Sequence, residues 1–248
     1  MPTPANPQTQ QQNNNHLLYD AALLATPDIN LFQPNWLQQH AHLQATSSGR
    51  GQSWFIEYEN QHWVLRHYLR GGLIAKFNRH LYFSWHAEQT RAWKEWRLLL
   101  QMRALNLPVP RPVAARAYWP AGQLSGFYCA DLLLETIPHC QTLSSLLQQQ
   151  TLTDAIWCEI GRCIKKFHRH DIYHADLNAN NILIDDKQKI YLIDFDRCRF
   201  TQNKKLLDTN LPRLQRSLLK LQKLHPVFNY TYAHWLTLSS AYADNTSS

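Results

Sequence analysis

The order of apolar and polar residues predicts a sheet-rich first half of the chain. From residue 48 to residue 69, SGRGQSWFIEYENQHWVLRHYL alternates apolar and polar positions on either side of Asn60 and Gln61. Successive side chains of a strand point to opposite faces of a sheet, so this alternation indicates two half-buried strands paired as a hairpin. The apolar segment CADLLLETI, at residues 129–137, is a further predicted strand.

The period then changes to that of a helix. In HAEQTRAWKEWRLLLQMRALNLPVPRPV, Trp93, Trp96 and Leu100 recur at helical spacing, and good helix formers continue to Leu105. The segment LPVPRP follows, and proline ends a helix because it lacks the required backbone donor. One long helix is therefore expected between the strands.

Helical segments dominate the second half. DAIWCEIGRCIKKFHRH, at residues 154–170, is amphipathic and has Thr153 or Asp154 as its cap. The segments LPRLQRSLLKLQKL and YAHWLTLSSAYA have the same period. After the first of these helices, NILIDDKQKIYLIDFD reads as two short strands joined by a tight turn at DDKQ.

These elements predict an α+β chain with a polar tail. Residues 1–16 contain no Lys, Arg, Asp or Glu and are rich in Gln, Asn and Pro, a composition too polar to offset the entropy of ordering. We expect this tail to be disordered. A sheet-rich lobe is expected at residues 17–135 and a mainly helical lobe at residues 136–248, within one domain.

Length and composition limit the class of protein and the compartment that can be expected. The chain has 248 residues, of which 44% are hydrophobic, enough for a substantial globular core. Neither a signal peptide nor an apolar run of the ~20 residues that span a membrane is visible, so we expect a cytoplasmic protein. The five cysteines include no CxxC pair, which favours reduced, packed thiols.

The net charge of +7 points to an anionic partner. Nucleic acid, nucleotide, an acidic sugar and an anionic membrane face all satisfy that requirement. Charge alone does not choose among them.

An acidic residue stands alone before the second-half hairpin. HADLNANN, at residues 174–181, places Asp176 on a loop, and the hairpin sets Asn181 across from Asp194. Amide and carboxylate oxygens without thiolates suit Mg²⁺ bound together with substrate phosphates. Asp176 is then placed to orient a substrate hydroxyl, and His174 to brace the loop. This is the kinase pattern H-x-D-x-x-x-x-N followed by D-F-x.

The first half supplies candidates for a nucleotide clamp. Gly49 and Gly51 could let backbone amides approach phosphates, although a plain turn explains two glycines equally well. Arg66 stands where kinases carry a strand lysine, and its planar fork is not equivalent to lysine at a phosphate. Glu95 on the long helix is its best ion-pair partner, and Glu88 is the rival.

Two substitutions and one absence separate the chain from regulated protein kinases. Ala175 replaces the arginine of H-R-D, Asp196 replaces the glycine of D-F-G, and no A-P-E follows. A sugar or other small-molecule kinase is therefore favoured over a switchable protein kinase.

Five segments in order carry a family resemblance: LRHYLRGG, TRAWKEWRLL, LPVPRPVAAR, HADLNANNILID and LIDFDRCR. Together, over residues 49–200, they resemble the Kdo (3-deoxy-D-manno-octulosonic acid) kinases of Gram-negative lipopolysaccharide assembly. The resemblance implies a protein-kinase-like bilobal fold and transfer of the ATP γ-phosphate to the 4-hydroxyl of Kdo on a Kdo-lipid A precursor. It also implies a peripheral position on the cytoplasmic face of the inner membrane. No obligate protein partner is evident from the sequence.

A mixed basic and aromatic stretch is compatible with that placement. Its members are Arg70, Lys76, Arg79, His80, Phe77, Tyr82, Phe83 and Trp85. Such mixtures can rest at an anionic lipid interface, and the arginines could instead grip the carboxylate and phosphates of the acceptor. A nucleic-acid partner is disfavoured because it leaves the kinase pattern unexplained.

Other functions share the same catalytic pattern. A lipopolysaccharide core heptose kinase and an aminoglycoside-type phosphotransferase would keep these residues and differ in acceptor contacts. A pseudokinase scaffold is the alternative of a different class, and the retained polar ligands argue against it.

Overall fold

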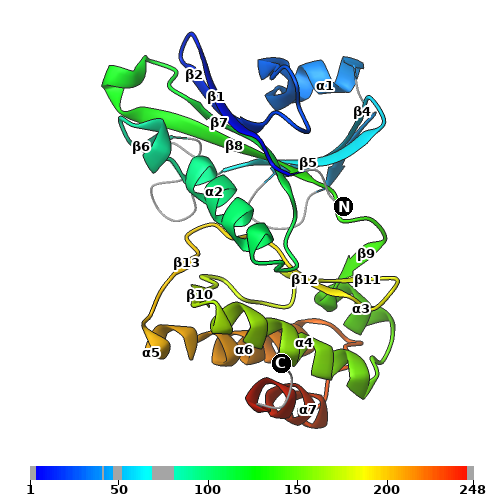
Figure 1. The fold of residues 1–248 in the computed structure, drawn as a ribbon. Helices are drawn as coiled ribbons and strands as arrows, with labels where there is room; N and C mark the ends of the chain where they lie inside the picture. The colour runs from blue at the N-terminus through cyan, green and yellow to red at the C-terminus, as the bar shows by residue number, and fades with distance from the viewer. Residues whose placement is uncertain (1–3, 41, 47–51, 69–80, 245–248) are drawn as a thin grey trace. The chain divides into compact units, whose positions relative to one another are not determined.

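The computed structural model (Figure 1) describes residues 4–40, 42–46, 52–68 and 81–244. The chain forms two compact units. Unit 1 contains Met1–Gln101 and Pro110–Thr136, and unit 2 contains Met102–Val109 and Ile137–Ser248. The sheet-rich and helical parts of the sequence thus lie in separate units, and the predicted α+β class is confirmed.

Unit 1 is built on an antiparallel sheet in the order β1-β2-β7-β8-β5-β4-β3. Its strands are β1 (Pro7–Gln12), β2 (Asn15–Asp20), β3 (His42–Thr46), β4 (Gln52–Tyr58), β5 (Gln61–His67), β7 (Pro112–Tyr118) and β8 (Phe127–Glu135), and β6 (Tyr82–Phe83) pairs with β8. The predicted hairpin is formed by β4 and β5. Its turn residues Glu59 and Asn60 have φ values of 50° and 60°, as two-residue turns that follow the strand twist require.

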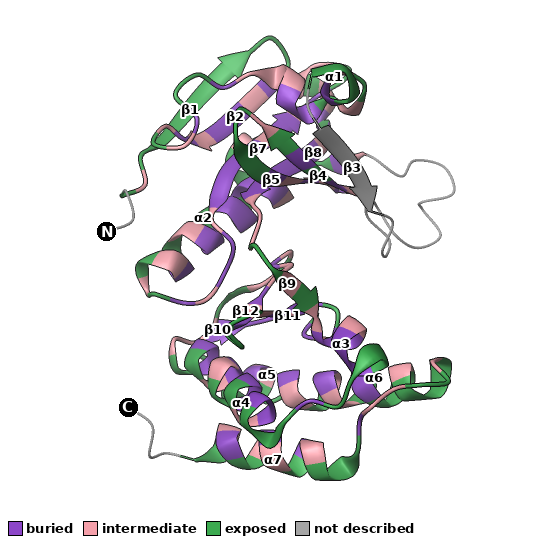
Figure 2. Cartoon of the chain, turned by 90° about the vertical axis from the view of Figure 1, so that its right-hand side faces the viewer, coloured by how far each residue is buried: buried purple, intermediate pink, exposed green. Residues whose placement is uncertain are grey.

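The expectation of a disordered tail is wrong for β1. This strand pairs with β2 from Pro7 opposite Asp20 to Gln12 opposite Asn15. All six of its residues are exposed, as Figure 2 shows, whereas β2 buries Leu17 and Leu18. Amino-acid composition reports only on side chains. The backbone of β1 can still form hydrogen bonds with β2, whatever side chains it carries.

Different segments cover the two faces of this sheet. On one face, η1 (Ile29–Phe32) and α1 (Pro34–His40) pack their buried Phe32 and Leu37 against Trp54 and Leu65. Arg66 follows Leu65 in β5 and therefore points to the opposite face. There it meets Glu95 of α2 (Arg91–Ala104), the predicted long helix.

Unit 2 contains the predicted second-half helices and hairpin. Its helices are α3 (Leu143–Gln149), α4 (Asp154–Arg169), α5 (Lys204–Leu207), α6 (Asn210–Leu224) and α7 (Tyr232–Ala243). Its strands form two small sheets, β12-β11-β9 and β10-β13, from β9 (Cys140–Thr142), β10 (Ile172–Tyr173), β11 (Ile182–Asp185), β12 (Ile190–Leu192) and β13 (Arg199–Phe200). Thr153 occupies the N-cap position of α4, without a side-chain cap hydrogen bond.

Helices α4 and α7 approach each other at a glycine. A Cβ atom placed on Gly161 would lie 2.3 Å from the backbone oxygen of Leu238 and 3.1 Å from the backbone nitrogen of Tyr242. One turn earlier on α4, the Trp157 ring stacks on His234 of α7 at 5.1 Å. The missing side chain therefore sets how closely α7 can pack.

All five cysteines are free thiols, as the sequence predicted. Burial raises the pKa of Cys163 to about 12 and that of Cys140 to about 11, so both stay protonated and unreactive at neutral pH. Within the described residues, no helix combines the length and apolar character needed to span a bilayer.

Candidate active site

The segment HADLNANN forms the loop between β10 and β11, and His174 fixes its backbone. The His174 ring nitrogen Nε2 lies 3.0 Å from the carbonyl oxygen of Ile193, and Nδ1 lies 3.2 Å from the backbone nitrogen of Asp176. A carbonyl can only accept, so Nε2 carries the proton and Nδ1 accepts from the Asp176 N–H. Burial lowers the pKa of His174, which keeps this neutral form. These contacts suit a bracing residue and leave no nitrogen for proton transfer.

Asp176 presents its carboxylate to solvent. Its side chain is 61% exposed. Oδ2 accepts from Nδ2 of Asn178 at 3.1 Å, and Oδ1 accepts from Nη1 of Arg213 at 3.4 Å. Each oxygen keeps acceptor capacity, so the carboxylate can receive a hydrogen bond from an incoming hydroxyl.

The β11–β12 hairpin brings Asn181 and Asp194 to the same end. The backbone nitrogen of Ile193 donates to the Asn181 carbonyl oxygen at 3.0 Å, so Asn181 faces Ile193, one residue before Asp194. Nδ2 of Asn181 donates to the Asp176 carbonyl oxygen at 2.9 Å. That bond orients the amide and leaves its oxygen as the free end. Asp194 has a φ of 65°, a left-handed conformation that ends the strand.

The donor set at this end of the hairpin fits a magnesium ion. Asn181 offers an amide oxygen and Asp194 a carboxylate. The described part of the chain holds no group of three or more His, Cys, Asp and Glu side chains that could bind a metal. A site with two protein oxygens is what Mg²⁺ uses when water and phosphate oxygens complete its shell, whereas zinc demands a fuller set of nitrogen or sulfur ligands.

In unit 1, Arg66 pairs with Glu95 and not with Glu88. Nη1 of Arg66 lies 2.8 Å from Oε1 of Glu95, and the Glu95 side chain is only 1% exposed. The hydroxyl of Tyr68 also donates to Glu95. Glu88 forms an exposed pair with Arg97 at 2.6 Å. The other clamp candidates, Gly49 and Gly51, lie outside the described residues.

Sequence reasoning missed a polar stripe on α6 that contacts the loop at residues 174–181. Asn210 binds the His174 backbone, donating to its carbonyl oxygen at 2.6 Å and accepting from its nitrogen at 3.2 Å. One turn later, Arg213 reaches Asp176. One turn further, the Ser217 hydroxyl accepts from the backbone nitrogen of Ala179 at 3.2 Å. The i, i+3, i+7 spacing was visible in the sequence, but nothing there identified the loop as the partner.

The network continues from Asn210 to the C-terminal helix. Its Oδ1 lies 3.0 Å from Nε2 of His168, and Nδ1 of His168 lies 2.8 Å from the Tyr242 hydroxyl. Since an amide oxygen only accepts, His168 donates through Nε2 and accepts from Tyr242. Burial lowers the pKa of His168 as well. Two neutral histidines therefore hold the loop.

Acidification should destabilise this network. In the unfolded chain, His168 and His174 bind protons as the pH falls through 6.5, the ordinary pKa of histidine. In the folded protein both stay neutral to lower pH, because burial lowers their pKa values. The free energy of unfolding therefore decreases from pH 6.5 down to those lowered pKa values. We expect the urea midpoint to fall between about pH 7.5 and about pH 5.5, above the range where carboxylates titrate. His168→Gln should flatten this dependence and the exposed His62→Gln should not. Equal pH profiles for all three proteins would contradict the assignment.

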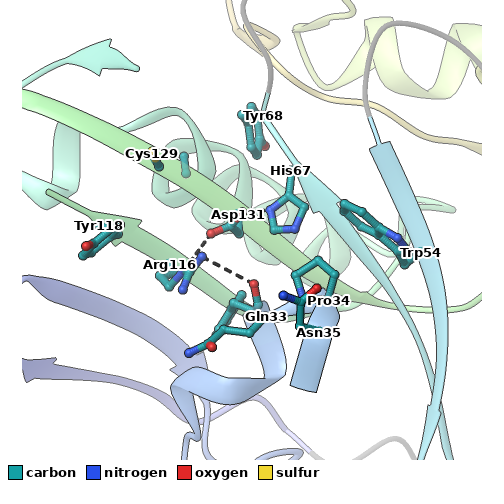
Figure 3. Close-up of a pocket in the computed structure, with 12 residues that line it drawn as sticks. Gln33, Pro34, Asn35, Trp54, His67, Tyr68, Arg116, Tyr118, Cys129 and Asp131 are labelled. Atoms are coloured by element: carbon teal, nitrogen blue, oxygen red, sulfur yellow. Dashed lines mark hydrogen bonds and ion pairs between the residues drawn. The ribbon is translucent and has the colours of Figure 1, made fainter. Parts of the chain in front are cut away.

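A pocket of about 440 Å³ lies in unit 1 (Figure 3). It is lined by His67, which follows Arg66 in β5 and therefore points to the opposite face of the sheet. His67, Asp131 and Arg116 form a row across β5, β8 and β7, with Nε of Arg116 at 2.7 Å from Oδ2 of Asp131 and His67 bonded to Oδ1. Burial alone would raise the pKa of Asp131, but Arg116 and His67 hold it below its usual range. The row ties three strands together beside the pocket, and none of its members was singled out from the sequence.

Comparison with known proteins gives the family. Residues 34–242 match the model of the lipopolysaccharide kinase (Kdo/WaaP) family. The chain belongs to this family. The resemblance expected from the sequence is confirmed, and with it the kinase-like α+β fold and phosphotransferase activity. Membership also implies the use of ATP.

Relatives named 3-deoxy-D-manno-octulosonic acid kinase align over most of the chain. The Vibrio parahaemolyticus protein is 39% identical over 216 residues, covering 86% of this chain and 88% of the relative. The Haemophilus influenzae (strain PittGG) protein is 37% identical over 239 residues, covering 94% and 98%. The Photobacterium profundum protein is 36% identical over 230 residues, covering 93% and 95%.

Proposed function

We propose that this member of the family transfers the γ-phosphate of ATP to the 4-hydroxyl of Kdo on a Kdo-lipid A precursor, in lipopolysaccharide core biosynthesis. The observation that carries the proposal is that relatives named 3-deoxy-D-manno-octulosonic acid kinase align over most of the chain, one of them over 94% of it. A heptose acceptor and an aminoglycoside remain the comparison cases for the test below.

Each site residue then has a role in placing the reactants. Asp176 accepts a hydrogen bond from the sugar hydroxyl and orients its oxygen for in-line attack. Asn181 and Asp194 would hold Mg²⁺, which would neutralise charge on the ATP phosphates. Arg66, kept in place by Glu95, is the unit 1 residue expected to bind phosphate oxygens of ATP. Gly49 and Gly51, outside the described residues, stay the predicted phosphate-loop positions. His174 holds the loop in the conformation that exposes Asp176.

Arg213 is placed to bind the acid group of the acceptor. Kdo is a sugar acid and carries a carboxylate, and Arg213 contacts the carboxylate oxygen of Asp176 while its own side chain is 39% exposed. The exposed part of this guanidinium lies beside the residue that receives the hydroxyl, which matches an acceptor that is both an alcohol and an acid.

Arg213→Gln should raise KM for a Kdo acceptor by about 10- to 100-fold, since hydrogen bonds to charged groups contribute about 1.5–3 kcal/mol. An acceptor whose carboxylate is converted to a carboxamide should lose less. The check is steady-state kinetics on both acceptors, with the exposed Arg216→Gln on the same helix as control. An equal effect on acid and amide would remove Arg213 from acceptor recognition.

We place the protein at the cytoplasmic face of the inner membrane as a peripheral protein, because the acceptor is anchored there by its lipid. The net charge of +7 supports attraction to an anionic lipid surface.

The test of the proposed function is incubation of the purified protein and Mg-ATP with separate acceptors, scored by mass. The panel contains a Kdo-lipid A precursor, heptosylated core, an aminoglycoside and a generic peptide. We expect one added phosphate on the Kdo precursor alone. Phosphate on another acceptor would reassign the substrate, and no magnesium-dependent ATP turnover with any of them would favour a pseudokinase scaffold.

A further inference from the structure

Three aromatic side chains gather on the surface of unit 1 where β6 pairs with the start of β8. Phe83 is 51% exposed, Trp85 52% and Phe127 48%. The Phe83 ring lies 4.6 Å from Trp85 and 5.6 Å from Phe127, both edge to face. Leu124, in the adjoining turn, is 97% exposed. We call Phe83, Trp85, Phe127 and Leu124 the aromatic corner.

The backbone of the aromatic corner is held by hydrogen bonds on both sides of Phe83 and Trp85. Ser84 donates its N–H to the Gly126 carbonyl at 2.8 Å and accepts at its own carbonyl from the Trp119 indole at 2.8 Å. The side-chain amide of Gln123 donates to the Trp85 carbonyl at 2.6 Å. The exposed rings are therefore carried by a braced scaffold.

Because Gly126 has no side chain, the rings of Phe83 and Trp85 can lie directly against its backbone. A Cβ atom there would lie 2.6 Å from the Phe83 ring and 3.0 Å from the Trp85 indole nitrogen. Its φ of 71° is also the left-handed conformation that side chains disfavour. The rings are thus fixed to one another while half of each surface stays in water. Removing apolar surface from water is favourable by about 25 cal/mol per Å². A cluster of exposed aromatic rings therefore indicates a surface that binds a partner.

The charge of the adjoining sequence selects an anionic partner. Between Glu59 and Glu88 the sequence contains no Asp or Glu, and besides Arg66, which is paired with Glu95, it contains Arg70, Lys76 and Arg79, which precede β6 and lie outside the described residues. Phenylalanine and leucine enter the acyl boundary of a bilayer, and tryptophan favours the headgroup level, where its indole N–H finds a partner. A protein partner would need a broad complementary face, whereas a bilayer accepts a small protruding cluster.

We propose that the aromatic corner inserts into the interface of an anionic bilayer and docks the enzyme on the membrane that holds its acceptor. This inference rests on the proposed function for the choice of membrane. Phe83, Phe127 and Leu124 supply the apolar contact, and Trp85 lies at the headgroup boundary.

The test compares the wild-type chain with a triple variant, Phe83→Ser, Trp85→Ser and Phe127→Ser, by sedimentation with phosphatidylethanolamine–phosphatidylglycerol vesicles. The control variant Tyr232→Ser with Leu236→Ser removes side chains of α7 that are 66% and 52% exposed. We expect the triple variant to bind vesicles at least about tenfold more weakly, as the loss of more than about 1.4 kcal/mol of buried apolar surface requires, and the control to bind like wild type. Equal binding by the triple variant, equal loss in the control, or concentration-dependent dimers of the wild type that the triple variant abolishes would overturn the proposal.

A second measurement separates this inference from the proposed function. Each protein is assayed with Kdo acceptor embedded in the same vesicles and with a water-soluble Kdo glycoside. The triple variant should lose turnover on the vesicle acceptor and keep it on the soluble one, which also shows that it folds. Loss on both would overturn the docking role. A wild type inactive on both acceptors would refute the proposed function while vesicle binding still tests the docking surface.

Discussion

Asp176→Asn should lower kcat by about 10²- to 10⁴-fold, the usual contribution of a general base, while the affinity for ATP stays nearly unchanged. The amide has the shape of the carboxylate but keeps a single acceptor oxygen, so it can accept from only one of Asn178 and Arg213. It cannot take the proton of the attacking hydroxyl. The contact that is lost is exposed, and the backbone bonds of His174 and Asn181 that hold the loop do not involve the carboxylate, so the folded loop should persist.

Steady-state phosphorylation of the Kdo acceptor gives kcat, and equilibrium binding of a fluorescent ATP analogue gives the affinity for nucleotide. Asp186→Asn is the matched control, because Asp186 is an exposed acid in the turn between β11 and β12. We expect the control to turn over normally. Turnover by Asp176→Asn within a few-fold of wild type would remove Asp176 from the role of base.

The arrangement of the loop at residues 174–181 and the hairpin after it could be predicted because its parts are close in sequence. A single hairpin determines where Asn181 and Asp194 lie, and a hairpin is specified by local alternation and turn composition. Its register was predicted one residue away from the observed one, since a turn of four residues does not fix which residues face each other. The sequence left Glu88 as a rival partner of Arg66, and only the packing of α2 shows that Glu95 forms the ion pair.

Contacts between distant segments could not be predicted from the sequence. Asn210 is buried because its amide serves the backbone of His174, and nothing in the pattern of α6 identifies that partner. The strand β1 was missed for a related reason: its polar side chains carry no burial signal, and its order comes from the backbone of β2. In both cases hydrogen bonds to a remote main chain replace the hydrophobic pattern on which sequence analysis depends.

Helix α7 is linked to the loop at residues 174–181 through Tyr242, His168 and Asn210, and it packs closely against α4 at Gly161. Gly161 is therefore the position where a small change should have a large effect. In an exposed helix, Gly→Ala stabilises by about 1 kcal/mol. Here the added Cβ would lie 2.3 Å from the Leu238 backbone oxygen, and backbone cannot move aside as a flexible side chain can. Overpacking of this kind costs about 1–3 kcal/mol, and we expect Gly161→Ala to destabilise the protein by at least that much.

The same displacement should reach the loop through Tyr242, His168 and Asn210. We expect Gly161→Ala to lower Tm by several degrees, on the order of 4 °C, and to lower kcat at temperatures where the protein is still folded. Arg162→Ala, at the next and exposed position of α4, is the control and should change Tm by less than about 1 °C, since an exposed ion pair contributes little. Thermal unfolding followed by circular dichroism measures the first effect, and initial rates well below Tm measure the second. A Gly161→Ala protein as stable as wild type would mean that α7 can shift without cost. A destabilised protein with unchanged kcat would show that the network from α7 does not hold the loop.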